Sequence, residues 1–113
     1  MEEKIIALIE SMTSVTKKKY LKWEKIALSG YYMTTIDDNV IYIGQVDDNT
    51  FTFVINNEKG ESVINLQVHP NELYYDGLRQ LFQAVQITNN DSQEIINKLI
   101  ESMKNEAGVQ ESD

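Results

Sequence analysis

The single histidine, His69, is the first residue to consider for chemistry, and it lies next to Pro70. A histidine that acts as a general base needs an orienting partner and a nucleophile within reach. The sequence has no cysteine, which excludes thiolate nucleophiles, thiolate metal ligands and disulfides. A single histidine also rules out a two-histidine metal site. We therefore interpret His69 as a turn residue, and we expect a protein that is not an enzyme and uses no metal or cofactor.

Two acidic pairs, Asp37-Asp38 and Asp47-Asp48, are the main candidates for carboxylate chemistry, and each is followed by an asparagine. An extended strand between them would separate the pairs by roughly 30 Å, at about 3.3 Å per residue, so they could not share one ion. Neither pair fits a calcium loop of the EF-hand type, which needs ligands at alternate positions and a distal glutamate. Turn formation explains both pairs. An enzyme remains an alternative only if other acidic residues converge in the fold.

Phosphate binding has little support in the sequence. The five glycines form neither a GxGxxG motif nor a P-loop. The lysine run from Lys17 to Lys25 lies beside Tyr20 and Trp23, the mixture that binders of single-stranded nucleic acid use. If this segment is a strand, however, Trp23 faces the core and Lys22 faces the solvent. The run is therefore interpreted as a solvated helix end, and nucleic acid is not expected as a partner.

The charge is divided unevenly along the chain. Residues 1–30 carry six lysines and four glutamates, a balance of +2, whereas residues 31–113 carry fourteen acidic and four basic groups, a balance of −10, which together give −8. An excess of this size repels phosphates and attracts basic partners. The sequence therefore favours a larger, more basic protein as the partner.

Adjacent tyrosines at Tyr31-Tyr32 and Tyr74-Tyr75 are candidates for a contact surface. Neighbouring rings point in different directions, so one ring of each pair can pack in the core while the other faces a partner. Exposed tyrosines are favoured in protein interfaces. Tyr31 and Tyr75 are the predicted contact residues, and the predicted acidic rim that steers association is made of Asp37, Asp38, Asp47 and Asp48.

The elements that position these residues follow from periodicity. Apolar residues at three- and four-residue spacing predict a helix over residues 2–17. Alternation then predicts strands near 20–25, 31–36, 40–46, 51–55 and 62–68, joined by short turns into an antiparallel meander. Residues 56–60 (NNEKG) are the strongest hairpin turn.

Two helices are predicted after the strands. The first opens at Pro70, with proline at its first position. The second opens at Asp91, where Glu94 completes a capping box, and it ends near residue 104. The predicted fold is α+β, with the helices on one face of a sheet of four or five strands. We expect one domain over residues 1–106 and a disordered acidic tail over 107–113.

Three short motifs carry a resemblance to known proteins: Leu21-Lys22-Trp23, Lys59-Gly60-Glu61 and Leu78-Arg79-Gln80-Leu81-Phe82. On these residues the chain resembles short bacterial α+β proteins with an LKW-type first strand, an antiparallel meander and a C-terminal helical pair. The likeness covers residues 5–103. It implies the same arrangement of elements, and it implies no activity and no site residue.

The function that these observations favour is that of a small acidic interaction module. It would bind and regulate a larger partner, as an immunity protein, an antitoxin or a phage-encoded inhibitor of defence does. The alternative is a small-molecule or nucleotide-signal binding domain that acts as a sensor or a sponge, and a homodimer is compatible with either function. The amphipathic, acidic N-terminus and the missing cysteines favour the cytoplasm, and no membrane partner is expected.

Overall fold

The first helix, α1, spans Glu2–Lys17 in the computed structural model, which describes residues 1–89 and 96–104. Its apolar positions bury Ile5, Ile9 and Met12 on one side. Glutamates in the first turn and Lys17 in the last turn favour the helix dipole. The helix predicted over residues 2–17 is confirmed.

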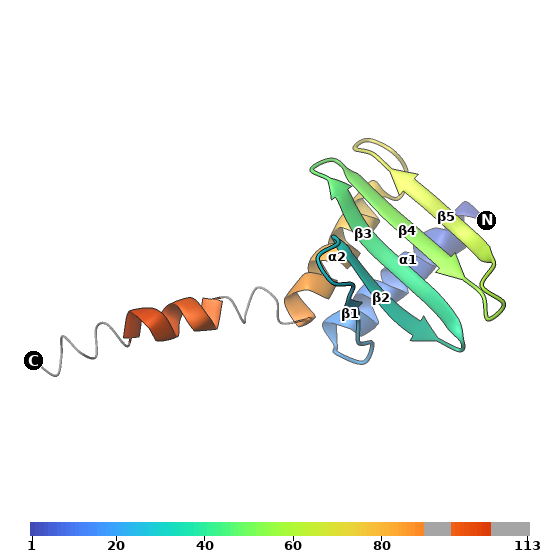
Figure 1. The fold of residues 1–113 in the computed structure, drawn as a ribbon. Coiled ribbons are helices and arrows are strands. Elements are labelled where there is room, and N and C mark those ends of the chain that lie inside the picture. Colours follow the sequence, from blue (N-terminus) through green and yellow to red (C-terminus); the bar gives the residue numbers. More distant parts are fainter. Residues whose placement is uncertain (90–95, 105–113) are drawn as a thin grey trace, which may run out of the picture.

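Five strands follow α1 and form one sheet in the order of the sequence, with each strand antiparallel to the next. The strands are β1 (Glu24–Lys25), β2 (Tyr31–Ile36), β3 (Asn39–Asp47), β4 (Thr50–Asn56) and β5 (Ser62–Val68). The connections between β2, β3 and β4 are too short for anything but hairpins. The predicted α+β meander is therefore confirmed (Figure 1).

The first strand is shorter than the sequence predicts. Tyr20 and Leu21 still donate their backbone N–H groups to the carbonyl of Val15, so the chain stays wrapped around the end of α1. Pairing with β2 therefore begins only at Glu24. It stops after Lys25 because Ala27 adopts a positive φ of 41° and turns the chain away.

The predicted turns are confirmed, and each has a local cause. Asp37 and Asp38 both adopt positive φ angles, 50° and 66°, as the tight hairpin between β2 and β3 requires. Gly60 has φ 81° between β4 and β5. There the side-chain oxygen of Asn57 accepts hydrogen bonds from the backbone N–H groups of Lys59 and Glu61.

The helix after the sheet, α2, spans Tyr75–Thr88, so the prediction that it opens at Pro70 is wrong. Asn71 and Tyr74 both adopt positive φ angles, which a helix cannot accommodate. The intervening loop is held instead by Glu72, whose carboxylate accepts a hydrogen bond from the backbone N–H of His69.

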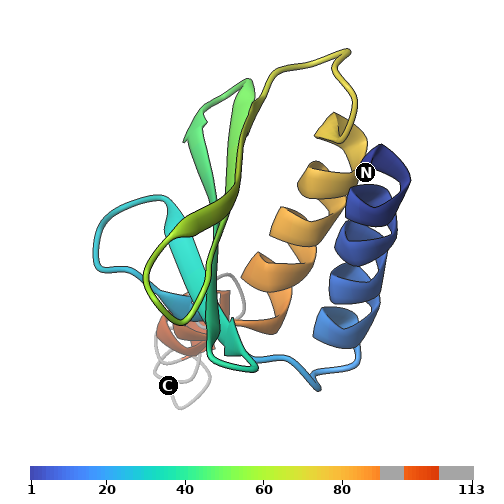
Figure 2. The same ribbon diagram turned by 90° about the vertical axis from the view of Figure 1, so that its right-hand side faces the viewer.

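The two helices lie side by side on one face of the sheet, and the other face is left uncovered by them (Figure 2). Gly77 permits their close approach, because a Cβ at this position would lie 3.3 Å from Cγ2 of Ile9. The core between the layers is aromatic and aliphatic. Its fully buried members are Ile9, Ile43, Phe53, Leu78, Leu81 and Val85.

Residues 96–104 form the second C-terminal helix. Its apolar side chains are exposed, with exposed fractions of 41% for Ile100 and 62% for Met103. The predicted capping box at Asp91 and Glu94 and the tail over 107–113 lie outside the described residues. None of the helices in the described ranges has the length and apolar character that a bilayer crossing requires.

Candidate functional site

The uncovered side of the sheet, which we call the open face, faces the viewer in Figure 1. Tyr32, Ile43 and Phe53 are buried beneath the sheet, and strand side chains alternate between faces. Their strand neighbours therefore point to the open face. It comprises Glu24 of β1, Tyr31, Met33 and Thr35 of β2, Val40, Tyr42 and Gly44 of β3, Thr52, Val54 and Asn56 of β4, and Val63, Asn65 and Gln67 of β5.

The centre of the open face is uncharged. One row across the strands pairs Met33 with Tyr42, Tyr42 with Val54, and Val54 with Asn65. At the β1 edge the row ends on a charge, because Glu24 pairs with Met33. Met33, Tyr42 and Val54 are half-buried, so part of each side chain remains in contact with solvent. An apolar, partly aromatic row on an uncovered sheet is typical of a surface that meets another macromolecule.

Tyr31, a predicted contact residue, lies on the open face and owes its position to Gly44. The two residues are directly opposite on β2 and β3. A Cβ at Gly44 would lie 2.7 Å from Cγ and from one Cδ of Tyr31, so the ring lies flat on the glycine. Any larger residue at position 44 would lift the ring. Gly44 thus fixes the orientation of the tyrosine without a hydrogen bond.

Next to Gly44 on β4 lies Thr52, which is only 9% exposed. Among the residues that the structure describes, its hydroxyl oxygen has no hydrogen-bond partner. A buried hydroxyl in this state costs about 1–3 kcal/mol. The open face therefore contains a polar group that the described part of the chain does not satisfy.

The predicted acidic rim lies at the two ends of the open face. Asp37 and Asp38 form the turn that begins β3, and Asp47 and Asp48 lie at its other end, as the sequence predicts. A hydrogen bond from the backbone N–H of Asn49, 2.8 Å long, is the main reason that the pKa of Asp47 is lowered. The hydrogen bond therefore favours the ionised form of Asp47, and the four aspartates flank the uncharged centre from both sides.

Tyr75, the other predicted contact residue, lies elsewhere. It begins α2 on the covered side of the sheet, and its ring packs against Phe51 with centroids 5.3 Å apart. No single flat surface can include both Tyr31 and Tyr75. The sequence reasoning also missed Met33 and Tyr42. Alternation turns both side chains away from the core, since Met33 follows the buried Tyr32 on β2 and Tyr42 lies between Ile41 and Ile43 on β3. Alternation does not show, however, that the helices leave that side of the sheet uncovered.

The partner of His69 in the structure is Glu72. Its Nδ1 lies 2.9 Å from a carboxylate oxygen of Glu72, and both side chains are exposed. Hydrogen bonds from the backbone and the ring of His69 lower the pKa of Glu72. Within residues 1–89 and 96–104, no group of three or more histidines, aspartates or glutamates is placed to hold a metal ion.

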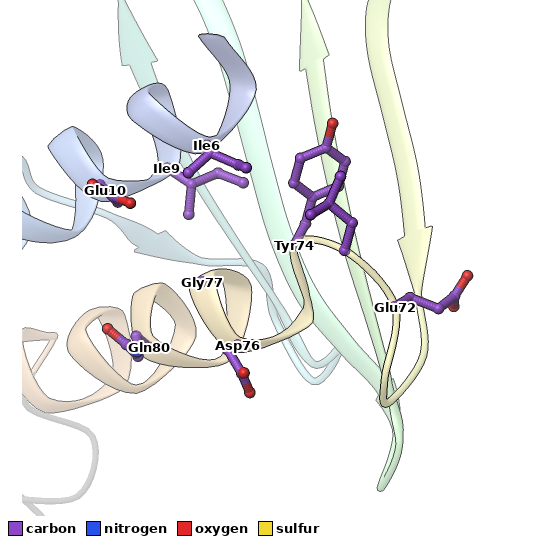
Figure 3. A pocket seen from close by; sticks show the side chains of 9 residues that line it. Ile6, Ile9, Glu10, Glu72, Tyr74, Asp76, Gly77 and Gln80 are labelled. Carbon is purple, nitrogen blue, oxygen red and sulfur yellow. The ribbon is translucent and has the colours of Figure 1, made fainter. Parts of the chain in front are cut away.

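A hollow of about 440 Å³ lies between the N-terminal halves of α1 and α2. Ile6 and Ile9 form its apolar wall (Figure 3). The carboxylates of Glu10, Glu72 and Asp76 lie apart around it and point in different directions. A small-molecule site needs a few polar groups that converge on the ligand, and here they diverge.

The lysine run lies at the opposite end of the helical layer. Lys19 and Lys22 line a shallow hollow with Trp23 and Thr88. The indole of Trp23 is buried and donates a hydrogen bond from Nε1 to Oγ1 of Thr16, at 3.0 Å. Trp23 is therefore a core residue, as predicted, and it offers no ring face on which a base could stack.

Comparison with known proteins adds no second line of evidence. No family model, no curated protein and no solved structure matches the chain. The resemblance to short bacterial proteins with an LKW-type first strand stays a prediction, and the function must be argued from the surface itself.

Proposed function

We propose that the protein is a non-enzymatic interaction module that binds and regulates a larger, more basic protein through the open face of its sheet. The observation that carries this proposal is the uncharged row of Met33, Tyr42 and Val54 on a sheet face that neither α1 nor α2 covers. The cores of protein interfaces are depleted in charge and enriched in tyrosine and methionine. The composition of the open face fits that description.

The rim explains why the partner is expected to be basic. Asp37 and Asp38 at one end and Asp47 and Asp48 at the other surround the uncharged centre with negative charge. Glu58 and Glu61 lie near Asp37 around one hollow and add negative charge, which Lys59 in the same hollow partly offsets. Charges at a rim steer the encounter and raise the association rate more than they raise the final affinity. A cationic surface would be drawn to this face and oriented on it.

For the alternative, a small-molecule or nucleotide-signal sensor, the hollow between α1 and α2 is one candidate site. Its rim carries the carboxylates of Glu10, Glu72 and Asp76. These charges repel phosphates, and among residues 1–89 and 96–104 no lysine or arginine lines the hollow to offset them. The open face therefore supports the interaction module better than the hollow supports the sensor.

Affinity purification from the host cell, in low salt and in high salt, tests the proposal. The wild type would be compared with Tyr42→Ala, which removes the central ring, and with Gln83→Ala, an exposed change on α2 that serves as the control. We expect one basic protein to be retained by the wild type and by the control, and to be lost with Tyr42→Ala. Recovery of no partner in either salt, or equal recovery with all three proteins, would contradict the proposal.

A second set of variants isolates the rim. Changing Asp37, Asp38, Asp47 and Asp48 to asparagine alters the net charge from −8 to −4. Asparagine tolerates the positive φ angles at positions 37 and 38, and its side-chain oxygen can still accept the hydrogen bond at position 47. The association rate with the purified partner should fall at low salt and depend less on ionic strength. The dissociation rate should change little.

A further inference from the structure

The two edges of the sheet differ in how they are protected. The β1 edge is two residues long, both of them charged, and the chain turns away just beyond it. The β5 edge is seven residues long, and its sequence SVINLQV contains no charge and no proline. Natural proteins blunt exposed edges with short strands, lysines, prolines or bulges. The β5 edge has no lysine and no proline. Its pairing with β4 shifts register once, near Val63, and is regular from Ile64 to Val68. No strand in the described part of the chain pairs with its outer side.

We infer that β5 pairs with β5 of a second copy, antiparallel about a two-fold axis, so that two five-stranded sheets join into one sheet of ten strands. This inference does not depend on the proposed function, because it uses the edge of the sheet and not the open face. The axis would run perpendicular to the sheet, which keeps the helices of both copies on the same side. An interface of this kind presents the same strand from each subunit.

The sequence of β5 is complementary to itself in one register. With Asn65 opposite Asn65 of the second copy, all seven residues lie opposite one another, and the irregularity near Val63 falls at the two ends of the pairing. Ser62 then faces Val68, and Ile64 faces Leu66. A shift by one residue would place core-facing side chains opposite outward-facing ones, and a shift by two residues would leave strand ends unpaired.

The side chains in this register are compatible on both faces. Ile64 and Leu66 point to the helical layer, where they are only half-buried in one copy, so their pairing covers apolar surface. Asn65 lies on the open face, where two carboxamides can donate to and accept from each other. No like charges meet along the strand. Glu61, just before β5, would face His69 of the second copy, just after it.

The predicted association is modest. A strand of seven residues is about 23 Å long at roughly 3.3 Å per residue, so pairing along it buries less than the 1,200 Å² or so of a standard interface. We therefore expect a dimer that dissociates in the micromolar range. Sedimentation equilibrium should show the mass rising with concentration from that of the 13.0 kDa chain to twice that value.

Charge variants at Asn65 test the register directly. Asn65→Lys and Asn65→Asp each place like charges opposite one another at the axis, and each should give a monomer at every concentration. An equimolar mixture of the two should recover the dimer, because only the mixed pair brings opposite charges together. Thr35→Lys, an exposed change on the same face but on β2, is the control and should dimerise like the wild type.

Thermal unfolding of each variant establishes that it is folded, which is expected because position 65 is exposed. A wild type that stays monomeric over the whole concentration range would overturn the inference. So would a lysine variant at position 65 that dimerises normally. Loss of the dimer with Thr35→Lys would overturn it too, since the contact would then use the open face.

Discussion

Replacing Gly44 with alanine tests how the fold positions Tyr31 on the open face. The new Cβ would lie 2.7 Å from Cγ of the ring, whereas ordinary contacts between such atoms are longer than 3.4 Å. The ring would have to move by more than half an ångström, and the atom in the way is near the backbone rather than at the flexible end of the side chain. Overpacking of this kind typically costs about 1–3 kcal/mol.

A second effect works in the opposite direction. A protein with glycine inside a strand is less stable, by roughly 0.5–1 kcal/mol, than the same protein with alanine at that position. We therefore expect Gly44→Ala to destabilise the wild type by about 1–2 kcal/mol. In a Tyr31→Ala background the clash disappears, and the same change should stabilise the protein by about 0.5–1 kcal/mol. The sign of the effect of Gly44→Ala should thus depend on residue 31.

Urea unfolding followed by the fluorescence of Trp23, which is buried and therefore sensitive to unfolding, gives the four free energies of this cycle. The expected coupling is about 1.5 kcal/mol or more, well above the roughly 0.5 kcal/mol within which independent sites add. If the effects of the two substitutions on the free energy of unfolding add within that margin, the ring of Tyr31 does not lie on Gly44. The glycine then does not orient the ring on the open face.

Three further predictions concern single residues. Thr52→Val should stabilise the protein by about 1 kcal/mol, because it removes a buried hydroxyl that has no partner among the described residues. The same change at Thr16 should destabilise it by about 1–3 kcal/mol, because the indole N–H of Trp23 would lose its acceptor; urea midpoints measure both. The carboxyl of Glu72 should titrate with a pKa below its ordinary range by NMR, because His69 donates to the ionised form. Its stabilising contribution is present above the unfolded-state pKa and is lost as the pH falls through the lowered folded-state pKa, and a Glu72→Gln variant should not show this loss.

Periodicity and turn chemistry in the sequence were sufficient to predict most of the fold. The helix over residues 2–17 follows from apolar residues at three- and four-residue spacing, and the meander follows from alternation of apolar and polar residues. Asp37-Asp38 and Asn57 to Gly60 are turn signals that act locally, so the structure realises them without help from distant contacts. The predicted ends of helices and strands were wrong where the local preference of a residue competes with contacts made by its neighbours. Pro70 suits a helix start, yet the hydrogen bond between His69 and Glu72 closes a loop there first.

The candidate site was predictable only in part. The acidic rim could be placed because both pairs belong to turns at the ends of one strand. The centre of the open face could not be placed from the sequence, because the side of the sheet that stays uncovered depends on where α1 and α2 pack. Tyr75 shows the reverse problem. Like Tyr31, it belongs to a pair of adjacent tyrosines and was therefore predicted to be a contact residue. In the structure, the start of α2 directs its ring against Phe51.

Photo-crosslinking in the host cell tests the central claim most directly, because it captures the partner whatever its identity. A photoreactive amino acid would replace Tyr42 in the open face or, as a control, the exposed Gln83 on α2. The account predicts a covalent adduct with one larger, basic protein from position 42 and none from position 83. No adduct at position 42, or the same adduct from both positions, would show that the open face is not the contact surface.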